Sequence, residues 1–280
     1  MPTADRALTE RVLASFDTTP SPRLREILRS LVVHLHAFTT DVHLTDGEWA
    51  GAVDFLTRVG QISDDRRQEA ILLSDVLGLS MLVVGLNHPD EGGAATPSTV
   101  FGPFFVEASP AFANGADISG GADGRPCSYS GRVTSTSGEP VPGALIEIWH
   151  SDEHGHYDVQ NPDLDTPQNR GRLHTETDGR YWFSSVLPEP YPIPDDGPVG
   201  ELLAATRRSG MRPAHVHFMI SAPGYETLTT HIFRAGDPHL GSDAVFGEKA
   251  PLVQTFLRSD TEPACYTMTY DFVLARRRTP

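Results

Sequence analysis

The first part of the chain places apolar residues with the period of an α-helix. Leucine, isoleucine and valine recur every three or four positions, at Leu24, Ile27, Leu28, Leu31, Val32 and Leu35. Ser21-Pro22 precedes this run, as expected for a helix cap followed by proline at the first helical position. Thr45-Asp46-Gly47-Glu48 has the pattern of a capping box before a further helix. We therefore predict helices from residue 1 to about residue 87.

One helix at the end of this region is predicted to be apolar on every side. It starts near Asp64 and contains the run ILLSDVLGLSMLVVGL, residues 71–86. A helix without a polar face is normally buried all round, which a small helical domain cannot achieve alone. We expect it to pack against the next domain or a second subunit, and predict a homodimer through the N-terminal helices. The run is too short to span a bilayer and contains Asp75, so no membrane insertion is expected.

Beyond residue 98 the apolar pattern becomes that of β-strands. β-Branched and aromatic runs alternate with glycine and proline turns: SYSGRVTST, ALIEIWH, GRLHTET, RYWFSSV, AHVHFMI, TLTTHIF and YTMTYDFVLA. Strands at this density, without helices between them, predict a mainly β fold, an antiparallel β-sandwich or barrel. Long connections at 157–168 and 191–208 are expected to be functional loops.

The composition of residues 88–98, HPDEGGAATPS, is that of a linker. We therefore assign residues 1–98 to an N-terminal helical dimerisation domain with its linker, and residues 99–280 to a β-sandwich domain.

Charge and cysteine content narrow the classes of function. With 22 Lys and Arg against 37 Asp and Glu, the net charge of −15 disfavours nucleic acid as a partner. The N-terminal residues carry charges throughout and no apolar core, so no secretory signal is predicted. The two distant cysteines, Cys127 and Cys265, are expected to be reduced thiols in a cytoplasmic protein. They also exclude a cysteine-based zinc site.

Two histidines one residue apart lie in the run RPAHVHF. In a strand, His215 and His217 would point to the same face, which suits two ligands of one metal ion. Upstream, Tyr157 and Tyr191 offer phenolate oxygens. Two imidazoles and two phenolates suit ferric iron better than zinc or copper(I). A core strand whose histidines form local hydrogen bonds is the alternative interpretation.

From Gly131 the chain reads GRVTSTSGEPVPGALIEIWHSDEHGHYD, which resembles the signature of the intradiol ring-cleavage dioxygenases. The segments PYPIP, RPAHVHF and APGYETLTTHIF look like the same family, and FGPFF and ILLSDVLGLS resemble its substrate-pocket segments. The similarity runs from about residue 20 almost to the C-terminus. It implies that residues 99–280 form the catalytic domain and carry the iron.

The resemblance also implies roles for individual residues. Tyr157, Tyr191, His215 and His217 would bind one non-haem Fe(III) per subunit, and Tyr191 would also accept a substrate proton. Arg212 would stabilise negative charge on the ring and the developing oxyanion. The substrate pocket would be lined by Leu72, Asp75, Val100, Phe101, Gly102, Pro103, Phe104, Ile193, Pro194 and Arg212. Related enzymes pair through their N-terminal helices and hold a phospholipid between them, which implies the same here.

The substrate hypothesis rests on two residues. His231 stands where many catechol-cleaving members carry glutamine, and histidine there resembles members acting on hydroxyquinol (1,2,4-trihydroxybenzene). We expect it to be a second catalytic group that hydrogen-bonds the substrate. Asp75 is an aspartate in an apolar helix, where it would accept a hydrogen bond from the third hydroxyl. A capped or water-bonded aspartate is the alternative for Asp75, and catechol or chlorocatechol are the alternative substrates.

Two other classes of protein share parts of the pattern. The glycine-rich turn after Gly131 also resembles non-enzymatic, prealbumin-like β-sandwich modules, but such modules have no use for His-x-His with two tyrosines. Cupin-type metal enzymes use His-x-His followed closely by a glutamate. Here Glu226 lies nine positions after His217 and beyond a proline-glycine turn, which disfavours that class.

Overall fold

The computed structural model describes residues 3–64, 67–88, 92–107, 109–161, 163–260 and 265–277. The chain divides into two compact units, residues 1–61 and residues 62–280. The boundary therefore differs from the division at residue 98 drawn from the sequence, because residues 62–98 fall in the second unit. Part of the expected linker, residues 89–91, lies outside the described residues.

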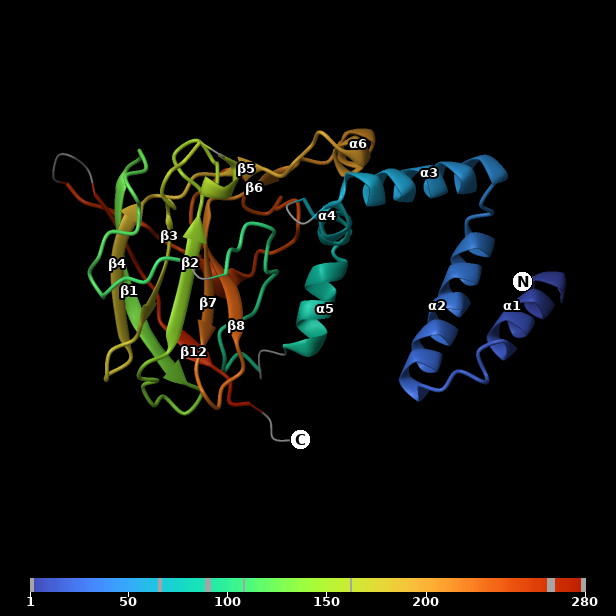
Figure 1. Ribbon diagram of the computed structural model, residues 1–280, viewed down its shortest axis with the longest axis horizontal. Coiled ribbons are helices and arrows are strands. Elements are labelled where there is room, and N and C mark those ends of the chain that lie inside the picture. The colour runs from blue at the N-terminus through green and yellow to red at the C-terminus, as the bar shows by residue number, and fades with distance from the viewer. Residues whose placement is uncertain are drawn as a thin grey trace. The chain divides into compact units, whose positions relative to one another are not determined.

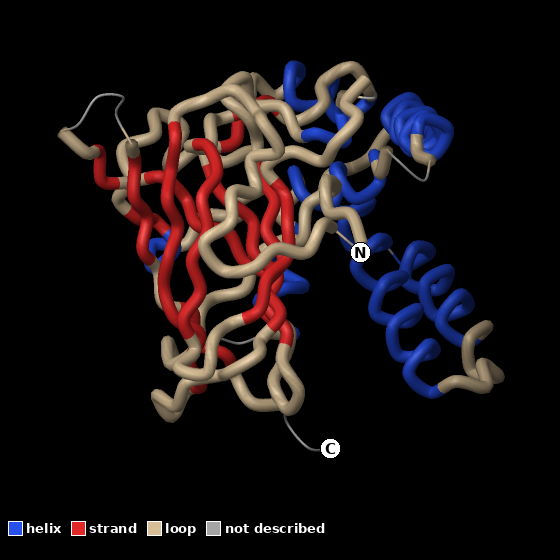
Figure 2. The backbone as a smooth tube through the Cα atoms, turned by 60° about the vertical axis from the view of Figure 1, so that its left-hand side comes forward, coloured by secondary structure: helices blue, strands red, loops and turns tan. Residues whose placement is uncertain are grey.

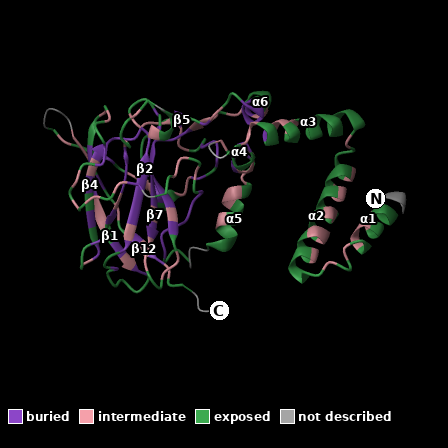
Figure 3. Cartoon of the chain, viewed as in Figure 1, coloured by how far each residue is buried: buried purple, intermediate pink, exposed green. Residues whose placement is uncertain are grey.

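The first unit is helical. It contains α1 (Thr3–Ala14), α2 (Pro22–Asp41) and nearly all of α3 (Asp46–Ile62). The predicted helix starts are confirmed: the Leu24 N–H donates to Ser21 Oγ (3.2 Å), and Thr45 and Glu48 form the reciprocal bonds of a capping box. No residue of α2 is buried, and six of its apolar side chains are 44–54% exposed. Most of the helix is accordingly coloured as exposed in Figure 3.

The prediction of a single apolar helix from about residue 64 to residue 86 is wrong. Two helices form instead, α4 (Glu69–Val76) and α5 (Leu79–Asn87), bent by 79° at the break between them. Gly78 adopts φ 72°, a left-handed conformation that glycine takes without steric cost. Among the described helices none is by itself long and apolar enough to cross a membrane, and only the bent pair of α4 and α5 meets that test jointly.

The two helices also differ in burial. α4 has four buried residues, including Leu72 and Asp75, whereas α5 has none. The expectation of burial on every side therefore fails for α5, at least within one chain.

Two five-stranded sheets dominate the second unit (Figures 1 and 2). One has the order β10-β11-β1-β12, with β4 also paired to β1, and the other has the order β3-β2-β7-β8-β9. The strands of the first sheet are β1 (Pro126–Ser135), β4 (Arg180–Val186), β10 (Leu257–Arg258), β11 (Tyr266–Thr269) and β12 (Phe272–Leu274). Those of the second are β2 (Leu145–His150), β3 (Arg170–His174), β7 (His215–Ser221), β8 (Leu228–Arg234) and β9 (Val253–Gln254).

Every predicted strand run contains a strand, but the purely antiparallel arrangement is wrong. β1 pairs in parallel with β11 and β12, and β8 pairs in parallel with β9, so both sheets are mixed. The last predicted run divides into β11 and β12. The expected loop at 191–208 contains β5 (Tyr191–Pro192) and α6 (Pro198–Ala205), and β6 (Met211–Arg212) follows it. The elements η1 (Asp158–Gln160) and η2 (Ala250–Leu252) are short 3₁₀ turns.

The register of β7 decides which residues enter the core. Val216, Phe218 and Ile220 belong to the main hydrophobic cluster, together with Tyr129 and Phe183. Because side chains alternate along a strand, His215 and His217 point to the opposite face. His215 and His217 are nevertheless buried, while Met219 and Ser221 further along that face are half-buried. Most of β7 is accordingly coloured as buried in Figure 3. A strand whose outer face holds buried histidines needs polar partners for them.

Candidate metal centre

Three buried imidazoles gather on the outer face of the second sheet. His215 and His217 come from β7, and His231 of β8 lies directly opposite His217 in the ladder. Their ring nitrogens lie within 4.8 Å of one another. The closest pair is His215 Nε2 and His217 Nε2, 3.1 Å apart.

The two predicted tyrosine ligands reach the same place. Tyr157 Oη lies 3.1 Å from His217 Nε2. Tyr191 of β5 pairs with Arg212 of β6, and Arg212 Nη1 donates to both Tyr191 Oη and His215 Nε2, each at 3.2 Å. These side chains and His231 are all between 0 and 3% exposed. The structure therefore brings together the four predicted ligands and both of the other predicted catalytic groups.

Glycine and a buried ion pair hold the Tyr157 loop against Tyr191. A Cβ on Gly155 would lie 2.7 Å from the Pro190 carbonyl oxygen, so only glycine allows this approach. Asp158, next to Tyr157, accepts a hydrogen bond from Arg170 Nε (2.8 Å), and both side chains are buried. Phe104 stacks on the Tyr157 ring with centroids 4.3 Å apart. The Tyr157 ring is therefore held in place by its surroundings rather than carried by a free loop.

The protonation states of the donors suit a metal ion. The His215 Nδ1–H donates to the Pro213 carbonyl oxygen (2.6 Å), which leaves the Nε2 lone pair facing the cluster. Burial lowers the pKa of His215 to about 3 and that of His217 well below its ordinary value, so both rings are neutral, as metal ligands must be. Burial raises the pKa of the Tyr157 phenol, so only a nearby cation would make it a phenolate. Neutral imidazoles beside phenols fit a hard, highly charged cation.

His231 fits a different role from the other two histidines. Arg212 Nη2 lies 3.4 Å from His231 Nδ1, and a guanidinium can only donate, so Nδ1 is the acceptor. Burial lowers the pKa of His231 well below its ordinary value, so the neutral ring carries its proton on Nε2. That nitrogen has no side-chain hydrogen-bond partner among the described residues, and the Val100 backbone lies close enough to favour the protonated ring. His231 therefore presents a buried N–H donor rather than a third lone pair.

The predicted pocket residues divide into two groups. Leu72, Val100 and Ile193 share one hydrophobic cluster with Val76, Val199, Leu203, Ala244 and Val245. Gly102 (φ 77°) lies so close to the imidazoles that a Cβ there would be 2.9 Å from His217 Cε1. In contrast, Phe101 and Pro103 are exposed and Pro194 is half-buried. Phe101 packs on Phe105 and Trp149 instead of entering the cluster of Leu72.

Asp75 is a buried charged residue on α4, the helix that supplies Leu72 and Val76 to this apolar cluster. It is 4% exposed, and burial raises the pKa of its carboxyl, although a Ser80 hydrogen bond and the Arg212 charge act in the other direction. Both the predicted pocket position and the predicted alternative of a hydrogen-bonded helix residue agree with this placement.

Comparison with known proteins gives the family. A model of the "Dioxygenase" family matches residues 100–276, and a model described as "Catechol dioxygenase N terminus" matches residues 21–95. The chain belongs to the intradiol ring-cleavage dioxygenases. It is 53% identical to a 6-chlorohydroxyquinol 1,2-dioxygenase of Cupriavidus pinatubonensis, over 95% of this chain and 96% of the relative. It is 54% identical to a hydroxyquinol 1,2-dioxygenase of Rhodococcus opacus, over 90% and 84%.

Solved structures give the same family. A hydroxyquinol 1,2-dioxygenase of Pseudomonas putida superposes with a TM-score of 0.92 at 42% identity, covering 98% of this chain and 99% of that one. A catechol 1,2-dioxygenase of Acinetobacter has a TM-score of 0.83 at 27% identity, covering 96% and 91%. Intradiol dioxygenases use non-haem iron, which agrees with the donor types described above.

One residue of this intradiol dioxygenase site was missed in the sequence. Asp243 accepts hydrogen bonds from Arg212 Nε (3.0 Å) and Nη2 (3.3 Å), and both side chains are buried. Burial alone would raise the pKa of the Asp243 carboxyl, but the Arg212 charge and hydrogen bonds keep it below its ordinary value. Nothing in the run GSDAVFG marks this aspartate, because its partner lies 31 residues earlier.

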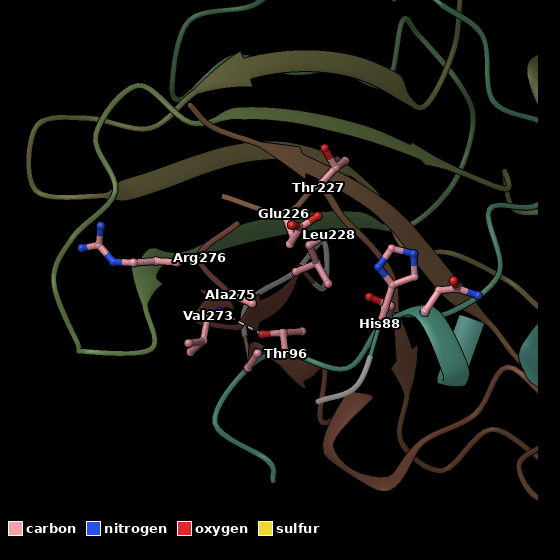
Figure 4. A pocket seen from close by; sticks show the side chains of 11 residues that line it. His88, Thr96, Glu226, Thr227, Leu228, Val273, Ala275 and Arg276 are labelled. Carbon is pink, nitrogen blue, oxygen red and sulfur yellow. Dashed lines mark hydrogen bonds between the residues drawn. The ribbon is translucent and has the colours of Figure 1, made fainter. Parts of the chain in front are cut away.

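A separate pocket lies between the end of α5 and the strands β8 and β12 (Figure 4). Its lining includes His88, Thr96, Glu226 and Arg276, and none of the predicted site residues. Arg276 is engaged elsewhere, in an ion pair with Glu139. We assign no part of the dioxygenase chemistry to it.

Proposed function

We propose that this enzyme cleaves hydroxyquinol by intradiol (ortho) ring opening, incorporating both atoms of O2 to give 3-hydroxy-cis,cis-muconate, the enol form of maleylacetate. The observation that carries the proposal is Asp75, a carboxylate buried beside the apolar cluster of Leu72, Val100 and Ile193. A third ring hydroxyl, which catechol lacks, would give this acceptor a further hydrogen-bond partner beside Ser80. The hydroxyquinol and chlorohydroxyquinol enzymes among its relatives support the same substrate class.

One Fe(III) per subunit would be held by Tyr157, Tyr191, His215 and His217. The support is the convergence of their donor atoms, with Tyr157 Oη and His215 Nε2 each 3.1 Å from His217 Nε2. Such separations are those of neighbouring donors on one ion with bonds of about 2.1 Å. When bound, a ferric ion supplies the Lewis acidity that favours the diol dianion and the redox partner that lets O2 react with the ring.

The residues of the chain would then bind, orient and deprotonate the diol. Tyr191 Oη accepts a hydroxyl proton, and the Arg212 hydrogen bond to that oxygen stabilises its anionic form beforehand. Arg212 also places a permanent positive charge where negative charge develops on the substrate. The His231 Nε2–H donates to a substrate oxygen. Because these groups are almost fully buried, their interactions act in a water-poor site.

The proposal is tested by oxygen uptake on hydroxyquinol, catechol and chlorocatechols with the purified enzyme. A hydrogen bond to a charged acceptor contributes about 1.5–3 kcal/mol, so the loss of the bond from the third hydroxyl should disfavour catechol by roughly one to two decades in kcat/KM. Equal or better cleavage of catechol or a chlorocatechol would overturn the substrate assignment and leave the ring-cleavage class intact.

The proposal extends to a homodimer formed through the N-terminal helices, with a phospholipid bound between them. Its support is the row of half-exposed apolar side chains on α2 and the unburied apolar residues of α5. Light scattering at micromolar concentration and mass spectrometry of organic extracts test the two parts separately. A monomer would exclude the pairing, and an extract without phospholipid would exclude the lipid.

A further inference from the structure

A buried carboxylate at the start of α4 has no part in the chemistry above. Glu69 is 1% exposed. Its Oε2 accepts hydrogen bonds from Arg67 Nε (3.2 Å) and Nη2 (3.0 Å). Its Oε1 accepts a hydrogen bond from the Val199 N–H (3.0 Å), in the first turn of α6. Glu69 therefore caps a helix 130 residues away in the sequence.

The surrounding residues are fitted to this carboxylate. Arg67 Nη1 donates to Asp196 Oδ2 (2.9 Å), which lies just before α6. A Cβ on Gly197 would lie 2.5 Å from Glu69 Oε1 and 2.6 Å from Arg67 Nη2. Its φ of −127° is open to any residue, so the glycine serves the close approach and not the backbone conformation. We call Arg67, Glu69, Asp196 and Gly197 the α4–α6 latch.

Both segments joined by the latch reach the substrate pocket. α4 carries Leu72 and Asp75, the latter six residues or about 9 Å along the helix from Glu69. The other segment runs from Tyr191 and Ile193 into α6, whose Val199 packs in the same cluster as Leu72. The latch therefore fixes the spacing between the Asp75 side of the pocket and the Tyr191 side.

We propose that Glu69 is a positioning residue that sets substrate selectivity by holding Asp75 in register with the Tyr191 segment. The inference rests on the proposed function, since it concerns recognition of the third hydroxyl. An ion pair between the buried Glu69 and the partly exposed Arg67 is a poor source of stability compared with an apolar contact of the same size. The three directional hydrogen bonds that Glu69 accepts instead restrict where α4 can lie, which an apolar contact would not do.

Two variants loosen the latch by different means. Glu69→Gln removes the negative charge and keeps an oxygen that can accept from the Val199 N–H. Gly197→Ala places a methyl group too close to the Glu69 and Arg67 side chains and should push them apart. Each should lower the hydroxyquinol-to-catechol ratio of kcat/KM by about three- to tenfold, less than the ~10²-fold that a 1 Å misplacement can cost. The change should lie mainly in KM for hydroxyquinol, with iron content and the visible spectrum unchanged.

Matched controls separate positioning from general damage. Gly85→Ala on α5 adds a methyl group where no atom lies within 4 Å, and Glu139→Gln removes an exposed ion pair with Arg276. Both should leave the ratio unchanged. If Glu69→Gln and Gly197→Ala fail to fold, Asp196→Asn decides, because Asp196 is largely exposed and only the outer bond of the latch is lost.

The outcomes distinguish this inference from the proposed function. A lower melting temperature with an unchanged ratio makes the latch purely structural and overturns the inference. A wild-type enzyme that prefers catechol overturns the proposed function instead. The latch is then supported if the two variants still shift the ratio in either direction, and overturned if neither does.

Discussion

The sheet wall of the site, formed by His215, His217 and His231, and the helix wall, formed by Leu72 and Asp75 of α4, are positioned by different means. The sheet wall is fixed by the ladder of β7 and β8, whose other face packs in the main core. The helix wall lies on an eight-residue helix, which is held by the apolar contacts of Leu72 and Val76 and by the bond of the buried Glu69 carboxylate to α6. The sheet can therefore hold donor atoms to a fraction of an ångström, while the helix can change its contacts without disturbing them.

The groups proposed for the chemistry and those proposed for selectivity lie in different parts of the fold. Every predicted metal ligand lies on strands or on a loop clamped to them. The residues proposed to read the third hydroxyl lie on α4. Variants of the predicted metal ligands should therefore abolish metal binding and turnover, and variants of the helix wall should change the choice of substrate.

The largest effect is expected from Tyr157→Phe, which removes one phenolate from the proposed iron site. Iron content should fall, the red to burgundy tyrosinate absorption should fade, and kcat/KM should drop at least about 100-fold, beyond what loss of an outer hydrogen-bond partner costs. Metal analysis and visible spectroscopy measure this. Tyr266→Phe, at a half-buried tyrosine of β11, is the matched control. Unchanged iron and colour in Tyr157→Phe would remove this residue from the ligand set.

The next effect concerns Arg212, which touches both the sheet wall and Tyr191. Asp243→Asn leaves a buried guanidinium without its counter-charge, and breaking such a pair costs up to about 3–5 kcal/mol in unfolding free energy. Because Arg212 also loses a bond that orients it, kcat should fall with little change in selectivity. Urea unfolding and steady-state kinetics test this. Asp178→Asn, which breaks the exposed pair with Arg180, should be nearly neutral. Equal effects in the two variants would contradict the role of Asp243.

The sequence predicted the sheet wall better than the helix wall. Strand runs and the period of two placed His215 and His217 on one face, and the capping pairs at Ser21 and Thr45 are local. The break at Gly78 was missed because the apolar run continues through it. Asp243 was missed because its pairing depends on tertiary contacts between distant segments. The parallel pairing of β1 with β11 and β12 was missed for the same reason, because the residues of a strand do not determine which strands pair with it.

A smaller effect is expected from Asp75→Ala in the helix wall, which should change substrate selectivity rather than the overall rate of turnover. The ratio of kcat/KM for hydroxyquinol to that for catechol should fall by about one to two decades, because the buried acceptor and its 1–3 kcal/mol preference disappear together. Iron content and colour should stay as in the wild type, since the sheet wall is untouched. If the ratio does not move, Asp75 is the hydrogen-bonded helix residue of the alternative interpretation, and the selectivity arises elsewhere.

The last prediction concerns pH and the strand beside the sheet wall. His150 of β2, next in the ladder to Val216 of β7, is fully buried, with Nε2 2.9 Å from Ser185 Oγ. Burial lowers the pKa of His150 from 6.5 to about 4. Between pH 6.5 and pH 4 the unfolded chain binds a proton at His150 that the folded chain does not. The contribution of His150 to the free energy of unfolding is therefore retained above pH 6.5 and lost as the pH falls toward 4. From His150 alone, about 2 kcal/mol of unfolding free energy should disappear between pH 7 and pH 5.

Urea unfolding at the two pH values, compared between wild type and His150→Gln, isolates this contribution. The variant should have a shallower pH dependence by that amount, whatever its stability at pH 7. His174→Gln, at the exposed end of β3, is the matched control and should keep the wild-type slope. Because His150 lies behind the sheet wall, the substrate ratio of the folded enzyme should not follow this titration. A ratio that changes with the same pH dependence would show that the two walls are coupled.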